Sequence, residues 1–140
     1  MDHTFHVYLN SEASKETFPA NDSRAFTQLL PERVILEPHG KWYCRVTACN
    51  LGFKLTKPHY LLCDFCSESS VGERKKPILC LLFHKLSEIV NPQWVPVKLR
   101  ELSQVKIWVQ RVDNPSSLSE KTGITYCILE FKKDTEDKRR

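Results

Sequence analysis

Eight short runs rich in apolar residues follow one another along the chain, and clusters of Pro, Gly, Asn and Ser separate them. The runs cover residues 5–9, 26–30, 42–49, 60–65, 78–83, 94–99, 105–109 and 124–131. Runs of this length, in which apolar and polar residues often alternate, predict β-strands rather than helices. Eight short strands in so small a protein indicate a closed or two-layered antiparallel β architecture.

Individual runs predict which residues face the core. Run 26–30 ends at Pro31, and the strongest run, 42–49, divides into two faces. We expect one face in the core, made of Trp42, Cys44, Val46 and Ala48, and the other turned outward, made of Tyr43, Arg45, Thr47 and Cys49. Run 105–109 follows the polar separator 100–103, and Trp108 alternates out of phase with its apolar residues.

Two runs predict strands in the middle of a sheet. Run 124–131 is apolar on both faces, so we expect it to be central. Run 78–83 is continuously apolar and is typical of a strand covered on both faces, although a short buried helix is the alternative. No internal repeat divides the chain, and we expect one domain over residues 1–132.

Length and charge narrow the function classes. The chain has 140 residues and a formal net charge of +4, with charges of both signs interspersed, which does not indicate a dedicated nucleic-acid binder. No apolar stretch reaches the roughly 20 residues of a membrane-spanning helix, and the start resembles neither a signal peptide nor a myristoylation site. We therefore expect a soluble protein that is made in the cytosol and has no membrane partner.

The six cysteines are interpreted as reduced thiols, because a reducing compartment disfavours disulfides and most of them lie inside apolar runs. Cys63-x-x-Cys66 is the one spacing that suggests a metal or redox site. A structural zinc site commonly needs two such pairs, and a redox motif needs a helix after it, so structural thiols are the favoured interpretation. Asn21-Asp22-Ser23 fits a glycosylation pattern, but without a secretory signal we expect it to be unmodified.

No enzyme signature stands out. The five histidines are scattered, the four glycines form no phosphate-binding loop, and no serine lies in a nucleophile elbow. Carboxylate pairs lie in polar segments, where nothing would shift their pKa. We expect no catalytic site and no cofactor. Residues 133–140 predict a charged C-terminal tail whose last three residues, Lys138, Arg139 and Arg140, are candidates for contact with a polyanion, although a solvated end is the plainer interpretation.

The order of several short motifs resembles a known family. The motifs are Phe5-x-Val7-x-Leu9-x-Ser11, Phe18-Pro19-x-Asn21, Phe26, Leu30-Pro31, Trp42, Cys63-Asp64, Gly72, Pro77, Gln93-x-Val95-Pro96-Val97, Val105 with Ile107, and Gly123 before run 124–131. In this order they resemble the minor capsid protein, or penton, of Polinton (Maverick) elements and of adintoviruses. The resemblance spans nearly the whole chain except residues 50–58.

The resemblance implies a fold and a function. It implies a single jelly roll, an eight-stranded antiparallel β-sandwich in which two four-stranded sheets pack face to face. It implies a homopentamer that fills an icosahedral vertex of a virion beside a major capsid protein, with weak DNA contact by the tail. Synthesis would be cytosolic, and the place of assembly, cytosol or nucleus, stays open. A ring needs a heterologous contact, which we expect the polar loops to supply.

Four residues are candidates for that contact, because large aromatic residues are enriched at interface centres: Phe18, Pro19, Trp94 and Trp108. The alternative for Phe18 and Trp94 is that they cap the ends of the sandwich. A β-sandwich module that binds another protein is the rival function, and an enzyme with an unrecognised site is the third.

Overall fold

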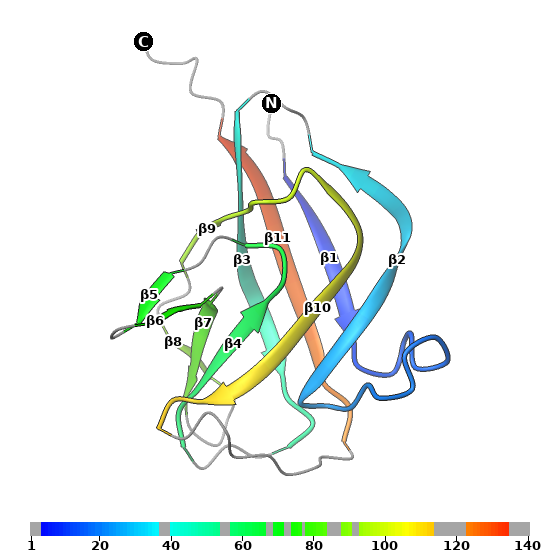
Figure 1. Ribbon diagram of the computed structural model, residues 1–140, viewed down its shortest axis with the longest axis vertical. Helices are drawn as coiled ribbons and strands as arrows, with labels where there is room; N and C mark the ends of the chain where they lie inside the picture. The colour runs from blue at the N-terminus through cyan, green and yellow to red at the C-terminus, as the bar shows by residue number, and fades with distance from the viewer. Residues whose placement is uncertain are drawn as a thin grey trace.

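The protein is an all-β fold of antiparallel strands in two larger sheets, as the hydrophobic pattern predicts. The computed structural model describes residues 4–36, 40–53, 57–66, 69–71, 74–76, 78–83, 88–90, 93–113 and 123–134. Sheet A has the order β1 (Thr4–Asn10), β11 (Tyr126–Asp134), β3 (Lys41–Asn50), β9 (Val95–Pro96). Sheet B has the order β2 (Ala25–Ile35), β10 (Glu101–Arg111), β4 (His59–Cys63), β7 (Ile78–Phe83), β8 (Glu88–Val90). The two sheets form separate layers, with β10 and β4 in front of β3 and β11 (Figure 1).

The strands pair in a nested order. The strand β1 pairs with β11, β2 with β10, β3 with β9 and β4 with β7, so the first predicted strand pairs with the last, the second with the next to last, and so on inward. Consecutive strands in this series alternate between the two sheets except at the innermost pair, β4 and β7, which share sheet B. The arrangement is that of one long hairpin folded over itself into two layers.

Each of the eight predicted runs contains a strand of sheet A or sheet B, and β8 is the one strand of these sheets that the pattern did not predict. The pattern also missed the hairpin β5 (Ser69–Val71) and β6 (Arg74–Lys76). These three-residue strands are too short to carry a hydrophobic period. Both predicted central strands are interior: β11 lies between β1 and β3, and β7 between β4 and β8.

The core lies between the sheets and is filled by side chains from both. The fully buried side chains of greatest volume include Phe65, Phe131, Leu9, Leu61, Leu82, Ile107 and Leu129. Phe131 of β11 stacks on Phe5 of β1 with ring centroids 4.9 Å apart, and it contacts Phe65, which follows β4 of the other sheet, at 5.7 Å. These rings join the two layers. Among the described residues, no helix is long and apolar enough to span a membrane.

The predicted core face of run 42–49 is correct in its first half and wrong in its second. Cys44 and Val46 are buried, but Ala48 is exposed, and Cys49 packs against the core instead. The cause is a β-bulge: Ile128 pairs with Ala48 and Leu129 with Val46, so Thr47 is an extra residue. One extra residue reverses the alternation of side chains beyond it.

Four predicted boundaries also differ from the structure. Strand β2 continues past Pro31. Between Leu29 and Val34 it has three residues more than the paired segment of β10, and this irregularity accommodates a proline, which has no N–H donor. Strand β10 begins at Glu101 inside the predicted separator. Of the predicted strand 94–99, β9 holds two residues and Val97 adds an isolated bridge to Cys66. At the end of the chain, β11 includes residues 133–134 of the predicted tail, because they pair with β3.

Candidate interaction surfaces

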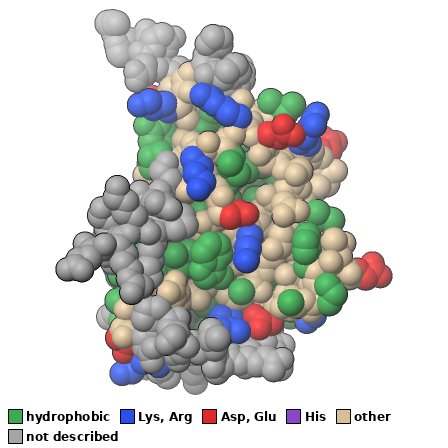
Figure 2. All heavy atoms as spheres, in the orientation of Figure 1, with side chains coloured by type: hydrophobic (Ala, Val, Ile, Leu, Met, Phe, Trp, Pro, Cys, Tyr) green, Lys and Arg blue, Asp and Glu red, His purple; other side chains and the backbone are tan. Residues whose placement is uncertain are grey.

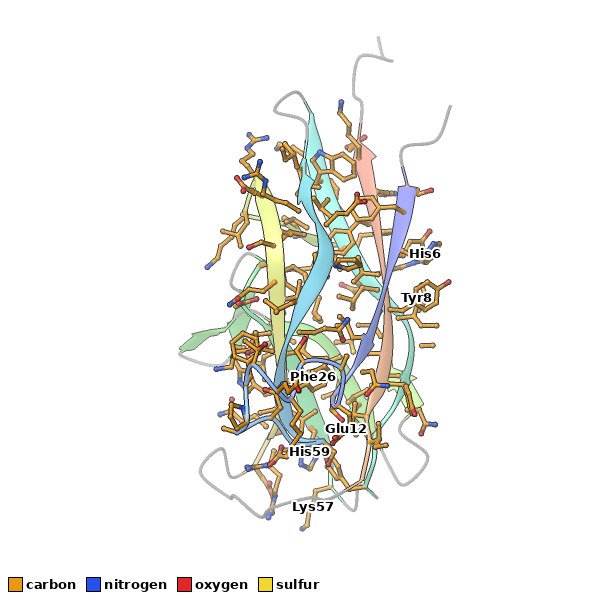
Figure 3. All side chains as sticks on the ribbon, turned by 90° about the vertical axis from the view of Figure 1, so that its right-hand side faces the viewer. His6, Tyr8, Glu12, Phe26, Lys57 and His59 are labelled. Carbon is orange, nitrogen blue, oxygen red and sulfur yellow. The ribbon has the colours of Figure 1, made fainter. Side chains whose placement is uncertain are left out.

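The outer face of sheet A carries an apolar row across three strands. Tyr8 of β1 lies opposite Ile128 of β11, which in turn lies opposite Ala48 of β3. Tyr8 is 67% exposed, and Tyr126, two residues before Ile128, is 47% exposed. Figure 3 shows Tyr8 and His6 pointing away from the other layer. This row therefore contributes exposed apolar surface to the outer face of sheet A.

The next row on the same face is charged. Glu130 of β11 lies between His6 of β1 and Arg45 of β3 in the strand register. The Arg45 Nε donates a hydrogen bond to Glu130 Oε1 at 3.0 Å, while His6 Nε2 lies 4.0 Å from Glu130 Oε2. Glu130 is the most buried member, with 18% of its side chain exposed. The pair fixes the arginine beside the neighbouring aromatic ring.

That ring belongs to Trp94, which is one of the four predicted contact residues. The Arg45 guanidinium carbon and the Lys132 Nζ each lie 4.5 Å from the centroid of the Trp94 ring. A cation at this distance is attracted by the ring's quadrupole. Trp94 is half-buried and directly precedes β9, and its contacts with Arg45 and Lys132 place it against the outer face of sheet A.

Trp108, another of the four predicted contact residues, lies on the outer face of sheet B. It lies opposite Ala25 of β2 on one side and Leu62 of β4 on the other, and it is half-buried. The Lys106 Nζ lies 5.5 Å from its ring centroid. This face looks toward the viewer in Figure 2, where hydrophobic side chains lie among charges of both signs. Trp108 thus lies on the outward face of β10, as its alternation with the buried residues Val105, Ile107 and Val109 predicts.

Phe18 and Pro19 lie in the loop between β1 and β2. Phe18 is half-buried and Pro19 is exposed. Two residues on, Asn21 is 6% exposed, and its side-chain amide forms two hydrogen bonds with the backbone of Thr27: the amide nitrogen donates to Thr27 O at 2.9 Å, and the amide oxygen accepts from Thr27 N–H at 3.0 Å. The side chain thus takes the place of a strand partner for Thr27 and is buried beside it.

A groove runs along the side of the sandwich where β1 and β2, the edge strands of the two sheets, lie next to each other. It has a volume of about 440 Å³. Most of its lining is apolar, including Phe5, Val7, Leu30, Pro31 and Val34, and the polar residues His6, Gln28 and Glu32 complete it. Gln28 bridges the strands at one side, because its amide oxygen accepts from Asn10 N–H at 2.7 Å and its nitrogen donates to Tyr8 O at 3.2 Å. The hydrophobic pattern does not predict this groove, and its one signal in the sequence is Pro31 within a strand-like segment.

The six cysteines carry free thiols, and five of them are buried. Burial raises the pKa of Cys63 and Cys80 far above the usual range, while a hydrogen bond with Cys44 is the main cause that raises the pKa of Cys66. Within the described segments, no group of three or more His, Cys, Asp or Glu side chains is arranged to hold a metal ion. The five buried thiols belong to the hydrophobic core, where they pack as small apolar groups.

The predicted sites do not converge on one place. Trp94 lies on the outer face of sheet A, Trp108 on that of sheet B, and Phe18 with Pro19 in a loop at the end of β1. Lys138, Arg139 and Arg140 lie outside the described residues. The exposed row of Tyr8 and Ile128 was missed, because an apolar residue on the outward face of a strand cannot be told from a core residue without knowing what covers it.

No protein-family model, curated protein or solved structure matches the chain.

Proposed function

We propose that the fold is a single jelly roll. The support is the nested pairing of β1 with β11, β2 with β10, β3 with β9 and β4 with β7. In a jelly roll, eight strands form two Greek keys, and a long antiparallel hairpin wraps into two facing sheets. The alternation of consecutive strands between the sheets is what such wrapping produces.

We further propose that the chain is a structural capsid protein, a penton subunit that forms five-membered rings at icosahedral vertices. The observation that carries this proposal is the nested strand order, which is found in many viral capsid proteins. The order of sequence motifs that resembles Polinton and adintovirus pentons is a second, independent support. A major capsid protein would be the neighbouring partner in the shell, and the subunit needs no catalytic group.

The ring contact needs two different faces, because each subunit of a ring meets its neighbour through a heterologous interface. The outer faces of the two sheets fit this requirement, since each carries a half-buried tryptophan and they point in opposite directions. The exposed Tyr8 row enlarges the apolar area of the first face. The strand faces, rather than the loops alone, then supply the contact.

Native mass spectrometry of the purified full chain tests the proposal. A complex of five chains is the expected result, and Trp108→Ala and Trp94→Ala should shift it toward monomers while the circular dichroism spectrum stays that of the folded protein. Thr4→Ala, an exposed change at the start of β1, is the matched control. A monomer over the whole micromolar range would contradict the penton proposal.

The groove between β1 and β2 supports a second candidate function, a module that binds an extended peptide. Both β1 and β2 are edge strands, and side chains already bond the backbone of Tyr8, Asn10 and Thr27. An added strand would lie along the groove beyond these residues, where the apolar lining would receive alternate side chains. A monomer that captures extended apolar peptides from a peptide library, and loses them on Val34→Asp, would favour this function over the capsid role.

A further inference from the structure

Cys49 of β3 and Cys127 of β11 lie directly opposite each other in sheet A. The bulge at Thr47 makes this possible, because it turns Cys49 from the outer face of the sheet to the core face, where Cys127 lies. Bulges commonly redirect a side chain in this way. Residues that face each other across two antiparallel strands point to the same side of the sheet, so the two thiols meet.

The backbone pattern shows which kind of pair they form. Between β1 and β11, the Ser11 N–H donates a hydrogen bond to Thr125 O. Two residues further along the same pair of strands, Leu9 lies opposite Cys127. Hydrogen-bonded pairs recur at every second residue, so the N–H and C=O of Cys127 point toward β1 and not toward β3. Cys127 and Cys49 are therefore a non-hydrogen-bonded pair, the type in which side chains approach most closely.

The separation suits a covalent bond. In a non-hydrogen-bonded pair the Cα atoms lie about 4.5 Å apart, and disulfides span Cα distances of about 4.4–6.8 Å. A hydrogen bond between the two thiols is also the main cause that raises the pKa of Cys127 well above its usual range. Both the strand register and this hydrogen bond place the two thiols next to each other in the reduced protein.

We propose that Cys49 and Cys127 form a cross-strand disulfide when the protein meets an oxidising environment, with a low-molecular-weight disulfide such as oxidised glutathione as the oxidant. The Cys49 thiolate attacks one glutathione sulfur and releases one glutathione thiolate. Cys127 then gives up its proton and attacks the Cys49 sulfur, which releases the second glutathione. Two electrons and two protons pass from the protein thiols to glutathione, and one protein S–S bond forms.

Exposure makes the reaction selective for this pair. Cys49 is half-buried, whereas the other five cysteines are buried, so it is the thiol that a dissolved oxidant reaches first. Cys44, Cys63 and Cys66 are each 0% exposed. Attack requires a thiolate, and an apolar surrounding keeps the proton on a buried thiol. Cys44, Cys63, Cys66 and Cys80 therefore react only after the fold opens, whereas Cys127 reacts in the folded protein because the sulfur of Cys49 lies directly opposite it.

The inference concerns the isolated subunit and does not depend on the proposed function. If the capsid proposal is correct, the disulfide would form when particles leave the reducing cytosol for an oxidising exterior, where disulfides persist. The bond would join two neighbouring strands whose cysteines are far apart in the sequence, so it would restrict the unfolded chain strongly.

Peptide mapping of the full chain provides the test. The protein is purified under reducing conditions and equilibrated with oxidised glutathione, and one half is then treated with N-ethylmaleimide in the folded state and the other half in guanidinium. Both halves are digested and analysed by mass spectrometry without reduction. We expect a cross-linked peptide that joins Cys49 to Cys127, and maleimide on the remaining cysteines only after unfolding. Oxidation should raise the melting temperature by roughly 5–10 °C. The rise should disappear in Cys49→Ser and persist in Cys80→Ser.

The mapping on the wild-type chain keeps the test valid if a variant fails to fold. Maleimide on both Cys49 and Cys127 after oxidation would overturn the proposal, and so would a different cross-link, such as one between Cys80 and Cys127. A stable mixed disulfide of Cys49 with glutathione would also overturn it, because it would show that Cys127 cannot reach the sulfur. None of these results bears on the number of subunits in the ring.

Discussion

Gly52 and Gly123 lie in direct backbone contact at the end of the sandwich where β3 ends and β11 begins. A Cβ atom added to Gly123 would meet the carbonyl group of Gly52, and one added to Gly52 would meet the backbone of Ile124. The Gly52 N–H also donates to Thr125 Oγ1 at 2.9 Å. Two segments far apart in the sequence are thus packed so closely that neither position has room for a side chain.

Gly123→Ala should therefore destabilise the fold by about 2 kcal/mol or more, because the added methyl group meets backbone atoms that cannot move aside. Urea unfolding followed by tryptophan fluorescence measures the effect. Ser103→Ala, at an exposed position of β10, is the control and should change stability little. Equal unfolding midpoints for the two variants would show that the contact is looser than described.

Asn21→Ala should cost about 2–3 kcal/mol of stability, since it removes both hydrogen bonds to Thr27 and leaves the Thr27 backbone groups without these partners. Asn50→Ala, at an exposed position, is the matched control. Asn21→Asp can still accept from Thr27 N–H but cannot donate to Thr27 O, so its stability should also fall. Hydrogen exchange at the Thr27 amide provides a local readout, and unchanged protection in Asn21→Ala would contradict the assignment.

The cation–π contact between Lys132 and Trp94 is measurable by a double-mutant cycle. Trp94→Ala, Lys132→Gln and the double variant are unfolded in urea at one protein concentration. The coupling energy should be about 0.5–1 kcal/mol, because the lysine lies 4.5 Å from the ring centroid. A coupling energy of zero would mean that the two side chains only share a surface. Changes in subunit number are followed separately by native mass spectrometry.

Stability should fall in alkaline solution because of the buried thiols. The pKa values of Cys63, Cys66, Cys80 and Cys127 are raised in the folded chain above the unfolded value of 9.0. Their contribution is complete below the unfolded pKa and is lost as the pH rises from there toward the folded pKa, since only the unfolded chain releases these protons. Each thiol then lowers the free energy of unfolding by about 1.4 kcal/mol per pH unit.

Guanidinium unfolding between pH 7 and 10 measures this slope under reducing conditions. Cys80→Ala should have a shallower slope than the wild-type chain, because one raised thiol is removed. Identical slopes in the two proteins would indicate that Cys80 ionises equally in both states. The exposed Lys106→Gln variant, which removes a charge and no thiol, is the control.

Deletion of residues 135–140 tests the proposed contact of the tail with DNA. Removal of Lys138, Arg139 and Arg140 should weaken binding to a duplex and reduce the dependence of affinity on salt, because fewer counterions are released. Fluorescence anisotropy across a salt series measures both quantities. The same affinity and the same salt slope for the full and the shortened chain would eliminate this contact.

The hydrophobic pattern determined the strands that make the two sheets. Alternation in residues such as Val7 and Leu9 of β1, and the doubly apolar run of β11, is a local property that follows from the pleat of a strand. The same local signal placed Trp108 on an outward face. It did not reveal β8 or the hairpin of β5 and β6, because strands of three residues are held by their partners and not by their own pattern.

Only the tertiary structure decided which residues meet. The periodic pattern placed Cys49 on the outer face, and the extra residue Thr47, which the partner strand β11 accommodates, turned it to Cys127. Likewise, the contact of Trp94 with Arg45 and Lys132 joins segments that are distant along the chain. A sequence by itself determines local periodicity and turn residues, because these act between near neighbours. Register, bulges and cross-sheet neighbours depend on the partner strand, so they exist only once the sheets have formed.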